Sequence, residues 1–481
     1  MATAPATAQE KRGIRYWMER VIKECERAKS GFEADPVHDL RVALRRCRSM
    51  AEGFRAVDPD PTWRKMRKTG KAVFSALGEL RDAQVMKSWV EKLGVTPDPV
   101  KDRLIGFCEA RETELKVQAA SAVLDFDAHA WLHWAEVLNS RERQLATMSD
   151  IFEVIALEKL EDALRLHQIA LRNRSKVALH AVRIGIKRFR YIVENFLPEQ
   201  DQRWSKDLKL LQDILGEIHD LDVLWATALR VRAFASPEER DRWRKAITHE
   251  RAQRIAVYRQ KLVGRNSLFA EWRQGLPSGE ALRQAITHKF EVWASFQNPE
   301  PEHAKRVAER SLGIYDALVS CGVTRGRAMH QVDVRDLLNV AALLNGVGRA
   351  NGKHRKRVLR RLQKLDVPPG WTPEHLRAIG VAVRCGRGKL VSDHRPSTHL
   401  GASKRRLVAL LAGILRLTQA IEKASPTPLG TVSLERRNGY LVLHSDGAPA
   451  SGKALERIAA RRYLLETACG MPILLSNADS P

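Results

Sequence analysis

VHDLRVALRRCRSMAEGFR, residues 37–55, is matched by LHAVRIGIKRFRYIVENF, residues 179–196, at a constant offset of 142 residues. Successive residues of an α-helix turn by about 100°, so side chains three and four positions apart share one face. Like charges on one face repel each other and destabilise an isolated helix. A chain that builds such a stripe twice is therefore expected to bind a polyanion. The matched residues are His38, Arg41, Arg45, Arg46 and Arg48 in the first copy, and His180, Arg183, Lys187, Arg188 and Arg190 in the second.

The repeat continues into the segment that follows each stripe. Residues 77–82, LGELRD, match residues 215–220, LGEIHD, at an offset of 138. On one helix, the lysines before the first segment would share a face with Gly78 and Asp82. The two halves are expected to pack about a pseudo-two-fold axis, so that four basic faces converge on one groove. The matched lysines are Lys68 and Lys71 in the first half, and Lys206 and Lys209 in the second.

Hydrophobic periodicity indicates that residues 12–275 form long amphipathic helices, with few stretches that look like strands. Short clusters of Pro, Asp and Glu interrupt the pattern, and such clusters stop helices. Breaks are predicted at residues 57–61, 96–100, 196–200 and 235–239. The region is therefore predicted to be all-α.

The net charge of the chain indicates which kinds of binding partner it can attract. The 481 residues carry a net charge of +25, and residues 281–481 hold 32 Lys and Arg against 16 Asp and Glu. Such a field attracts nucleic acid, polyphosphate or acidic membrane surfaces. An aromatic content of only 6% argues against platforms that stack single-stranded bases.

The distribution of cysteines and of apolar residues indicates the cellular compartment in which the protein is expected. The six cysteines are scattered without a CxxC pair, which favours a reducing environment. The first residues lack the hydrophobic core of a signal peptide. The longest apolar run, residues 407–415, is too short to span a bilayer. We expect a soluble, cytoplasmic protein that does not enter membranes.

The two stripes, together with ALGELRDAQV at 76–85 and ILGEIHDLDV at 214–223, resemble the CHAD family, the conserved histidine α-helical domains. The resemblance covers roughly residues 10–275 and includes both halves in order, and the domain is expected to span residues 10–285. It implies a helical domain of two pseudo-symmetric halves with a central basic groove that binds inorganic polyphosphate. By position, the groove would use all fourteen basic residues named above. Asp82 and Asp220 would orient or neutralise basic side chains.

A second domain is expected from residue 286, again helical to residue 425. AALLNGVG at 341–348, KHRKRVLRRL at 353–362 and LRLTQAIE at 415–422 resemble the HD-like C-terminal domain of exopolyphosphatases. An HD site needs a His and an Asp that hold a divalent metal. Here Asn345 and Gly346 stand at that pair, and Gln419 and Glu422 stand at the later acidic positions.

The chemistry expected of this second domain is therefore limited. His303 and His354 could survive from a metal site, but two histidines without a carboxylate pair make a poor hydrolytic centre. We expect no metal, no cofactor and no phosphohydrolase activity. The retained feature is positive charge, which suggests that an anion track extends here. The basic residues are Lys353, Arg355, Lys356, Arg357, Arg360, Arg361 and Lys364, followed by Lys404, Arg405 and Arg406.

Residues 426–481 are expected to form a small α/β subdomain. Alternating apolar residues flank Asn438 and Gly439, which is a strong hairpin pattern. A helix over residues 451–467 and a last strand over 472–476 are predicted to follow.

The sequence as a whole thus predicts a mainly α protein that binds inorganic polyphosphate without catalysis, and other polyanions are further candidate partners. The resemblance further suggests association with polyphosphate granules. Two alternatives remain open: a nucleic-acid-binding protein, or a phosphohydrolase that acts on polyphosphate or nucleotides.

Overall fold

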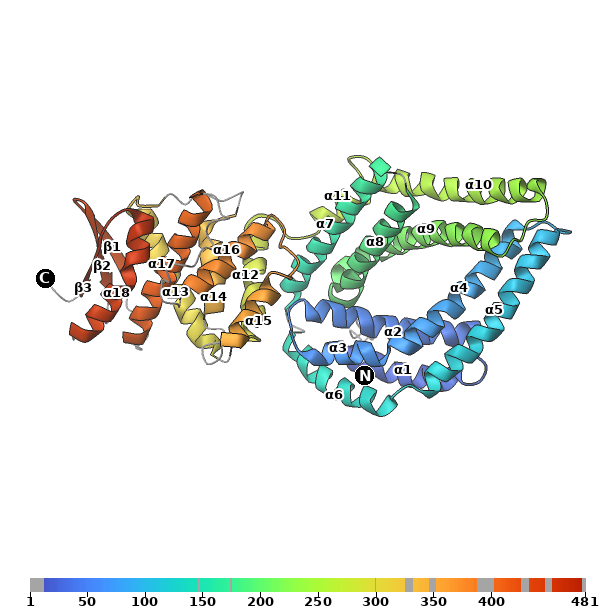
Figure 1. The fold of residues 1–481 in the computed structure, drawn as a ribbon, viewed down its shortest axis with the longest axis horizontal. Helices are drawn as coiled ribbons and strands as arrows, with labels where there is room; N and C mark the ends of the chain where they lie inside the picture. Colours follow the sequence, from blue (N-terminus) through green and yellow to red (C-terminus); the bar gives the residue numbers. More distant parts are fainter. Residues whose placement is uncertain are drawn as a thin grey trace, which may run out of the picture. The chain divides into compact units, whose positions relative to one another are not determined.

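The computed structural model describes residues 13–145, 148–173, 175–298, 300–324, 332–345, 352–386, 402–424, 432–445 and 452–477. The chain forms two compact units, one of residues 1–56 and 60–277 and the other of residues 57–59 and 278–481. Both are helical, and a small sheet lies in the second (Figure 1). In the described part, no helix is long and apolar enough to span a membrane.

The first unit consists of two consecutive sets of helices. The first set is α1 (Ile14–Ala28), α2 (Ala34–Arg55), α3 (Pro61–Thr69), α4 (Lys71–Leu93), α5 (Pro99–Leu124) and α6 (Ala128–Leu145). The second set is α7 (Ser149–Asn173), α8 (Lys176–Phe196), α9 (Pro198–Arg230), α10 (Pro237–Leu262) and α11 (Leu268–Gln274). Equivalent helices pack in the same way: α1 on α2 and α4 on α5 in one half, α7 on α8 and α9 on α10 in the other. The predicted duplication of an all-α unit is confirmed.

The four predicted breaks are confirmed, and the same local chemistry produces them. A proline occupies the first turn of α3, α5, α9 and α10. Proline fits there because the missing N–H would have no partner inside the helix. Acceptors just before the prolines cap other N–H groups: Asp60 accepts from the Thr62 N–H at 2.8 Å, and Asp98 from the Val100 N–H at 3.0 Å.

α2 crosses α8 near the C-terminal end of each helix. Phe54 of α2 and Phe196 of α8 occupy equivalent positions of the repeat, and their rings meet edge to face with centroids 5.0 Å apart. Phe152 of α7 stacks on Phe196 at 4.0 Å. Gly53 permits this approach, because a Cβ there would lie 2.3 Å from the Phe196 ring. A buried aromatic cluster therefore fixes the contact between the halves.

α4 and α9 provide the second contact between the halves. Trp89 and Val90 of α4 share a buried cluster with Leu221 and Leu224 of α9. Figure 1 shows that α2 and α8 converge at one side of this unit, and α4 and α9 at the opposite side. The basic stripes occupy the parts of α2 and α8 that lead away from their crossing.

One expectation about the first half is wrong. Lys68 and Lys71 were expected on one helix, but α3 ends at Thr69 and α4 begins at Lys71. Gly70 lies between them, and a Cβ there would lie 3.0 Å from the Trp131 ring. The close packing of Trp131 therefore accounts for a glycine at this point, and glycine weakens a helix. In the second half, Lys206 and Lys209 do share α9.

The second unit begins with α12 (Gly279–Ser295), so the first unit ends at Pro277, before the boundary of 285 expected from the sequence. It continues with α13 (Pro301–Ser320), α14 (Val334–Asn345), α15 (Gly352–Leu362), α16 (Pro373–Cys385) and α17 (Ala402–Ala424). Strands β1 (Val432–Arg437) and β2 (Tyr440–Ser445) form the predicted antiparallel hairpin, and Gly439 in its turn has a φ of +86°. After α18 (Gly452–Cys469), β3 (Ile473–Asn477) pairs in parallel with β2. This segment packs on α17 and belongs to the same compact unit as the helices.

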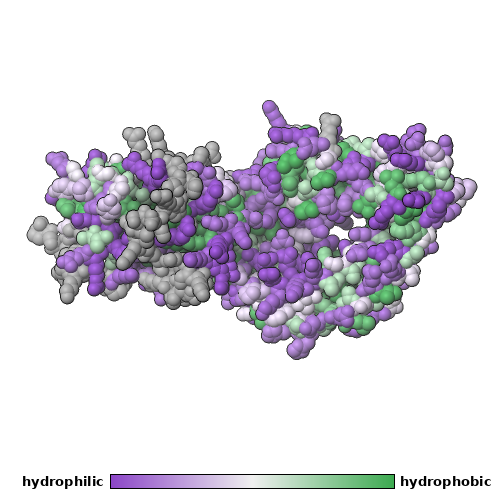
Figure 2. Space-filling view, in the orientation of Figure 1, coloured by the Kyte–Doolittle hydropathy of each residue, from purple (hydrophilic) through white to green (hydrophobic). Residues whose placement is uncertain are grey.

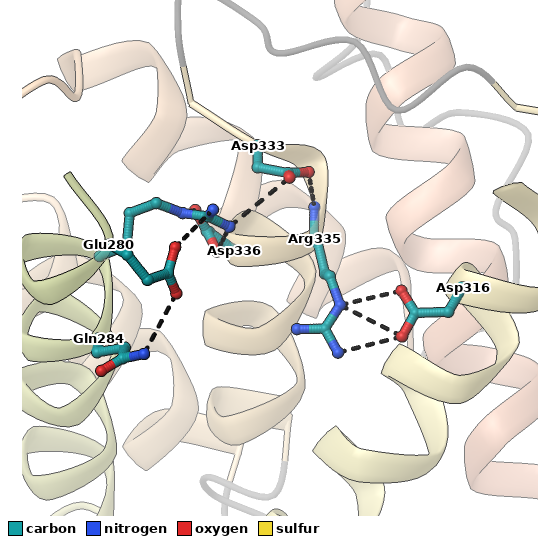
Figure 3. A network of polar contacts seen from close by, with 7 residues as sticks. Glu280, Gln284, Asp316, Asp333, Arg335 and Asp336 are labelled. Carbon is teal, nitrogen blue, oxygen red and sulfur yellow. Dashed lines mark hydrogen bonds and ion pairs between the residues drawn. The ribbon is translucent and has the colours of Figure 1, made fainter.

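Ion pairs join the first three helices of the second unit (Figure 3). The Arg283 guanidinium of α12 donates two hydrogen bonds of 3.1 Å to the Asp336 carboxylate of α14. Arg335 of α14 donates to Asp316 of α13 at 2.9 Å. These exposed pairs fix the register of the helices more than they add stability, because exposed ion pairs contribute at most about 1 kcal/mol.

Candidate functional site

The basic stripes face away from the core because α2 and α8 are amphipathic. The fully buried side of each helix is apolar. It comprises Val37, Leu40, Leu44 and Cys47 on α2, and Val182, Ile186, Phe189 and Val193 on α8. The stripe residues fall outside this buried side and are half-buried or exposed. In the space-filling view, hydrophilic side chains gather around a hollow in the middle of this unit (Figure 2).

Four cations from the two halves lie within electrostatic reach of one another: Arg41 and Arg45 of α2, and Arg183 and Lys187 of α8. We call them the cation cluster. All four are half-buried. Burial, and then the positive charges of the three arginines, lower the pKa of Lys187 to about 8. The structure therefore brings equivalent residues of both stripes within electrostatic reach of each other.

The guanidinium of Arg41 is in a similar electrostatic environment. Burial lowers its pKa, and the charge of Arg45 lowers it further, against the attraction of Asp82. Gathered cations without enough counter-charge raise the free energy of the unbound protein. A bound anion would relieve this cost, which is the electrostatic signature expected of an anion site.

Polar atoms around the cluster lack partners. Arg41 Nη1, Arg183 Nε and Tyr191 Oη are buried, yet none has a hydrogen-bond partner among the residues that the structure describes. Leaving a buried donor unpaired costs about 1–3 kcal/mol. Arg41 lies on α2, and Arg183 and Tyr191 lie on α8, so an anion with several acceptor oxygens could satisfy donors from both halves.

Two carboxylates lie among the cations, Asp82 of α4 and Asp220 of α9. They are equivalent positions of the repeat and lie near enough for the charge of Asp82 to raise the pKa of Asp220. Burial is the larger cause, and together they raise the pKa of Asp220 to about 6. Burial also raises the pKa of Asp82, although Arg41 and Arg183 oppose this. The carboxylates therefore only partly neutralise the cluster.

The two stripes each continue with an arginine after the cation cluster, and the two arginines contact different kinds of side chain. Arg48 lies over the Phe74 ring at 4.6 Å, whereas Arg190 donates to Gln212 Oε1 at 3.0 Å. Phe74 and Gln212 are equivalent positions of the repeat. The two halves thus hold matching arginines in place by cation–π contact on one side and by a hydrogen bond on the other.

Arg46 differs from the other stripe residues. Its guanidinium pairs with Glu194 and donates to Asn195 Oδ1 at 3.0 Å, and it lies 5.4 Å from the Trp17 ring. Asn195 in turn donates to Ser49 Oγ at 2.9 Å. Arg46 therefore ties α2 to α8 and leaves little capacity for an anion, unlike its exposed equivalent Arg188.

The remaining sequence-predicted residues are spread over α2, α3, α4, α8 and α9. They are exposed except for half-buried His180, whose ring lies 4.6 Å from that of His219. Exposed side chains can reach a polymer that leaves the cation cluster, but the structure does not gather them there. The exposed residues are His38, Lys68, Lys71, Arg188, Lys206 and Lys209.

Comparison with known families agrees with this geometry. Residues 14–229 match the family model described as the CHAD domain. Residues 14–229 of this chain are thus assigned to the CHAD domain family. Among solved structures, the chain is similar to the crystal structure of the CHAD domain from the plant Ricinus communis, with 20% identity and a TM-score of 0.36, over 56% of this chain and 90% of that chain. A search of curated proteins gave no match.

One residue of the CHAD domain was missed by the sequence analysis. Tyr191 follows Lys187 by four positions, so it extends the α8 stripe by one turn. Lys187 Nζ lies 5.7 Å from its ring, and burial raises the pKa of the phenol, which keeps it protonated as a donor. Helical spacing alone could have found it, but aromatic residues at this spacing usually pack in the core.

The second unit contains two of the residues from the predicted remnant of a metal site, His303 and Glu422. His303 Nδ1 lies 4.0 Å from Glu422 Oε2, while the buried Arg310 guanidinium forms an ion pair with Glu422, with Nη1 at 2.9 Å from Oε1. The Glu422 carboxylate, which a metal would need as a ligand, is thus already paired with an arginine. His354 and Gly346 lie outside the described residues. In the described part of the chain, no group of three or more His, Cys, Asp or Glu side chains is arranged to hold a metal.

Proposed function

We propose that the CHAD domain of this chain binds inorganic polyphosphate in the hollow between α2 and α8, without catalysis. The observation that carries the proposal is the cation cluster with its unpartnered donors Arg41 Nη1 and Arg183 Nε. Each phosphate of the polymer offers oxygens that accept charge-assisted hydrogen bonds, and arginine forks suit them. A repeating anion also matches a site that is itself repeated.

The burial of the cluster favours a thin polymer over duplex nucleic acid. Arg41, Arg45, Arg183 and Lys187 are all half-buried, so an anion has to enter the hollow to contact them. A phosphate chain without bases can do so, whereas a duplex presents its phosphates on the outside of a wide rod. Exposed lysines of α3, α4 and α9 would then hold the emerging polymer.

Binding without turnover follows from the surroundings of the two carboxylates. Phosphoryl transfer usually needs metal ions and a group that positions the nucleophile. Asp82 and Asp220 lie among arginines, and their raised pKa values show that ionisation is costly there. They would adjust the charge of the groove and would not gather metal.

We further propose that the second unit is a degenerate HD-like domain that adds to the anion track. The described part of α15 and the turn after it leave Lys356, Arg357, Arg360 and Lys364 exposed. Arg361 instead donates to Gln297 Oε1 at 3.1 Å. A cytoplasmic location and association with polyphosphate granules would follow from the same function.

Calorimetric titration with polyphosphate chains of defined length tests the proposal. The full chain should bind them with an affinity that falls steeply as salt rises, because binding releases counterions. Duplex DNA at equal phosphate concentration should compete poorly. Displacement of labelled polyphosphate by that DNA would contradict polymer selectivity, and phosphate release in Mg²⁺ or Mn²⁺ would contradict the absence of catalysis.

A further inference from the structure

A pocket of about 630 Å³ lies within the CHAD domain between α4, α5, α8 and α9. Comparing the sequences of the two halves does not predict this pocket, because helices of both halves line it: α4 and α5 of the first, and α8 and α9 of the second. Its size is within the range of small-molecule sites, roughly 300–1,000 Å³. Apolar groups form much of its lining, among them Ala83, Met86, Phe107, Leu115, Val223 and Ala226.

Apolar side chains at this pocket are open to solvent. Val177, at the start of α8, is 80% exposed, and Val223 of α9 is 36% exposed. Both line the pocket. Exposed apolar surface within a concave site gains free energy when a ligand covers it, by about 25 cal/mol per Å². The pocket therefore suits a ligand with an apolar or flat aromatic body.

Polar groups connect this pocket with the basic groove. His180 and Asp82 line the pocket, and both belong to the stripes or carboxylates of the groove. His180 Nδ1 is buried and lacks a hydrogen-bond partner among the described residues. The ring of His219, also on the pocket wall, lies 4.6 Å away. A ligand could thus place its body in the pocket and its phosphates along the stripe.

The charged groups of the pocket wall carry both signs. Asp222 is paired with Lys176 at 3.0 Å and Arg251 at 3.1 Å, and Arg111 with Glu79 at 3.3 Å. Carboxylates beside a phosphate-binding stripe would repel a pure polyphosphate but accept hydrogen bonds from hydroxyl groups. This combination of an apolar surface, hydroxyl acceptors and adjacent cations matches one ligand class.

We propose that this pocket binds the nucleoside of a nucleoside triphosphate, with its phosphate chain directed into the basic groove. The base would cover Met86, Phe107 and Val223, and Asp82 would accept from the ribose hydroxyls. His180 and Arg183 would donate to the phosphates. The proposal rests on the anion-binding function of the groove, and it adds an organic ligand that competes with the end of a polyphosphate chain.

Calorimetric titration of the full chain with ATP and with inorganic tripolyphosphate tests this proposal, because the two ligands share the phosphates and differ in the nucleoside. ATP should bind about tenfold more tightly than tripolyphosphate. In Ala226→Trp, the added ring fills the pocket from an exposed position of α9, so ATP should lose this advantage while tripolyphosphate binds as before. Ala110→Trp, at an exposed position of α5 that does not line the pocket, is the matched control and should keep the advantage.

The outcomes separate this inference from the proposed function. If tripolyphosphate binds and ATP binds no more tightly to the unmodified chain, the nucleoside pocket is wrong and the groove stands. Retention of the ATP advantage in Ala226→Trp, with an unchanged thermal unfolding curve, would overturn it as well. If neither ligand binds while longer polyphosphate chains do, the nucleoside pocket is wrong and the groove stands; if the longer chains also fail to bind, both proposals fail. The comparison of ATP with tripolyphosphate needs no variant, so a folding defect in Ala226→Trp leaves the proposal testable.

Discussion

The rings of Phe54 and Phe196, which occupy the same position in the two halves of the repeat, meet edge to face at 5.0 Å where α2 crosses α8. This contact fixes the angle at which the two basic stripes diverge. It also accounts for the position of the cation cluster, because both stripes begin within two turns of the crossing. The packing of two apolar side chains thus determines where the two basic stripes approach each other.

Truncation at this crossing should therefore affect stability and binding together. Phe196→Ala removes a ring that contacts Phe54 and stacks on Phe152 at 4.0 Å. We expect a loss of about 3–5 kcal/mol in the free energy of unfolding, measured by denaturant titration, because a buried cavity remains. The conservative Phe196→Leu should lose much less. An Ala variant within about 1 kcal/mol of the wild type would contradict the role of the crossing.

Two equivalent glycines offer a matched test of the position of Arg41. A Cβ on Gly78 of α4 would lie 3.0 Å from Arg41 Nη1, whereas a Cβ on Gly216 of α9 would meet nothing within 4 Å. Gly78→Ala should displace the guanidinium and weaken polyphosphate binding a few-fold in calorimetry. Gly216→Ala should leave affinity unchanged and stabilise the helix by up to about 1 kcal/mol. Equal affinities of the two variants would show that Arg41 does not contact the polymer.

The lowered pKa of Lys187 predicts that binding depends on pH. Its pKa is about 8 in the free protein, and bound phosphate favours the ammonium form, so the pKa is higher in the complex. Affinity should be flat below pH 7 and fall by up to about tenfold per pH unit as pH rises past 8. Calorimetry at pH 8 in buffers of different ionisation enthalpy should show proton uptake. Lys187→Arg should remove most of this dependence, and an unchanged profile would contradict the assignment.

Ionised Asp220 destabilises the folded protein. Its pKa of about 6 in the folded protein lies above an unfolded value of about 3.9, so the folded state is penalised as its carboxyl ionises. The penalty grows between about pH 4 and 6 and is complete at pH 7. Asp220→Asn should stabilise the protein at pH 7.5, by on the order of 2 kcal/mol, and have no effect near pH 3.5. It should also strengthen polyphosphate binding at neutral pH.

The control for this effect is Asp213→Asn, which removes an exposed charge from the same helix. Thermal unfolding at the two pH values provides the measurement. Destabilisation by Asp220→Asn at pH 7.5 would mean that the attraction of Arg183 exceeds the cost of burial.

The sequence predicted much of the fold because its signals are local. Proline clusters located the helix starts at Pro61, Pro99, Pro198 and Pro237, and the Asn438–Gly439 pair located the hairpin. The break at Gly70 was missed, since its cause is the distant Trp131, which packs against the glycine. Packing between segments far apart in the chain is not visible in helical periodicity.

The candidate site was predictable only in part for the same reason. The repeat gave the stripe residues, including Arg41 and Lys187, which the fold brings together. It could not separate Arg46, which pairs with Glu194, from Arg45, which lies in the cluster. Neighbouring positions on one helix look alike in sequence, and only the partner helix decides which of them is neutralised.

The most direct test of the central claim, that both stripes hold one polyanion, is calorimetric titration of polyphosphate into the double charge reversal Arg45→Glu with Lys187→Glu. One change lies on each stripe, and both residues belong to the cation cluster. Arg244→Glu with Lys245→Glu, at exposed positions of α10, changes the net charge by the same amount and is the control. The account predicts at least about a 100-fold loss of affinity in the first variant and a small change in the control. Equal affinity of the two variants would contradict it.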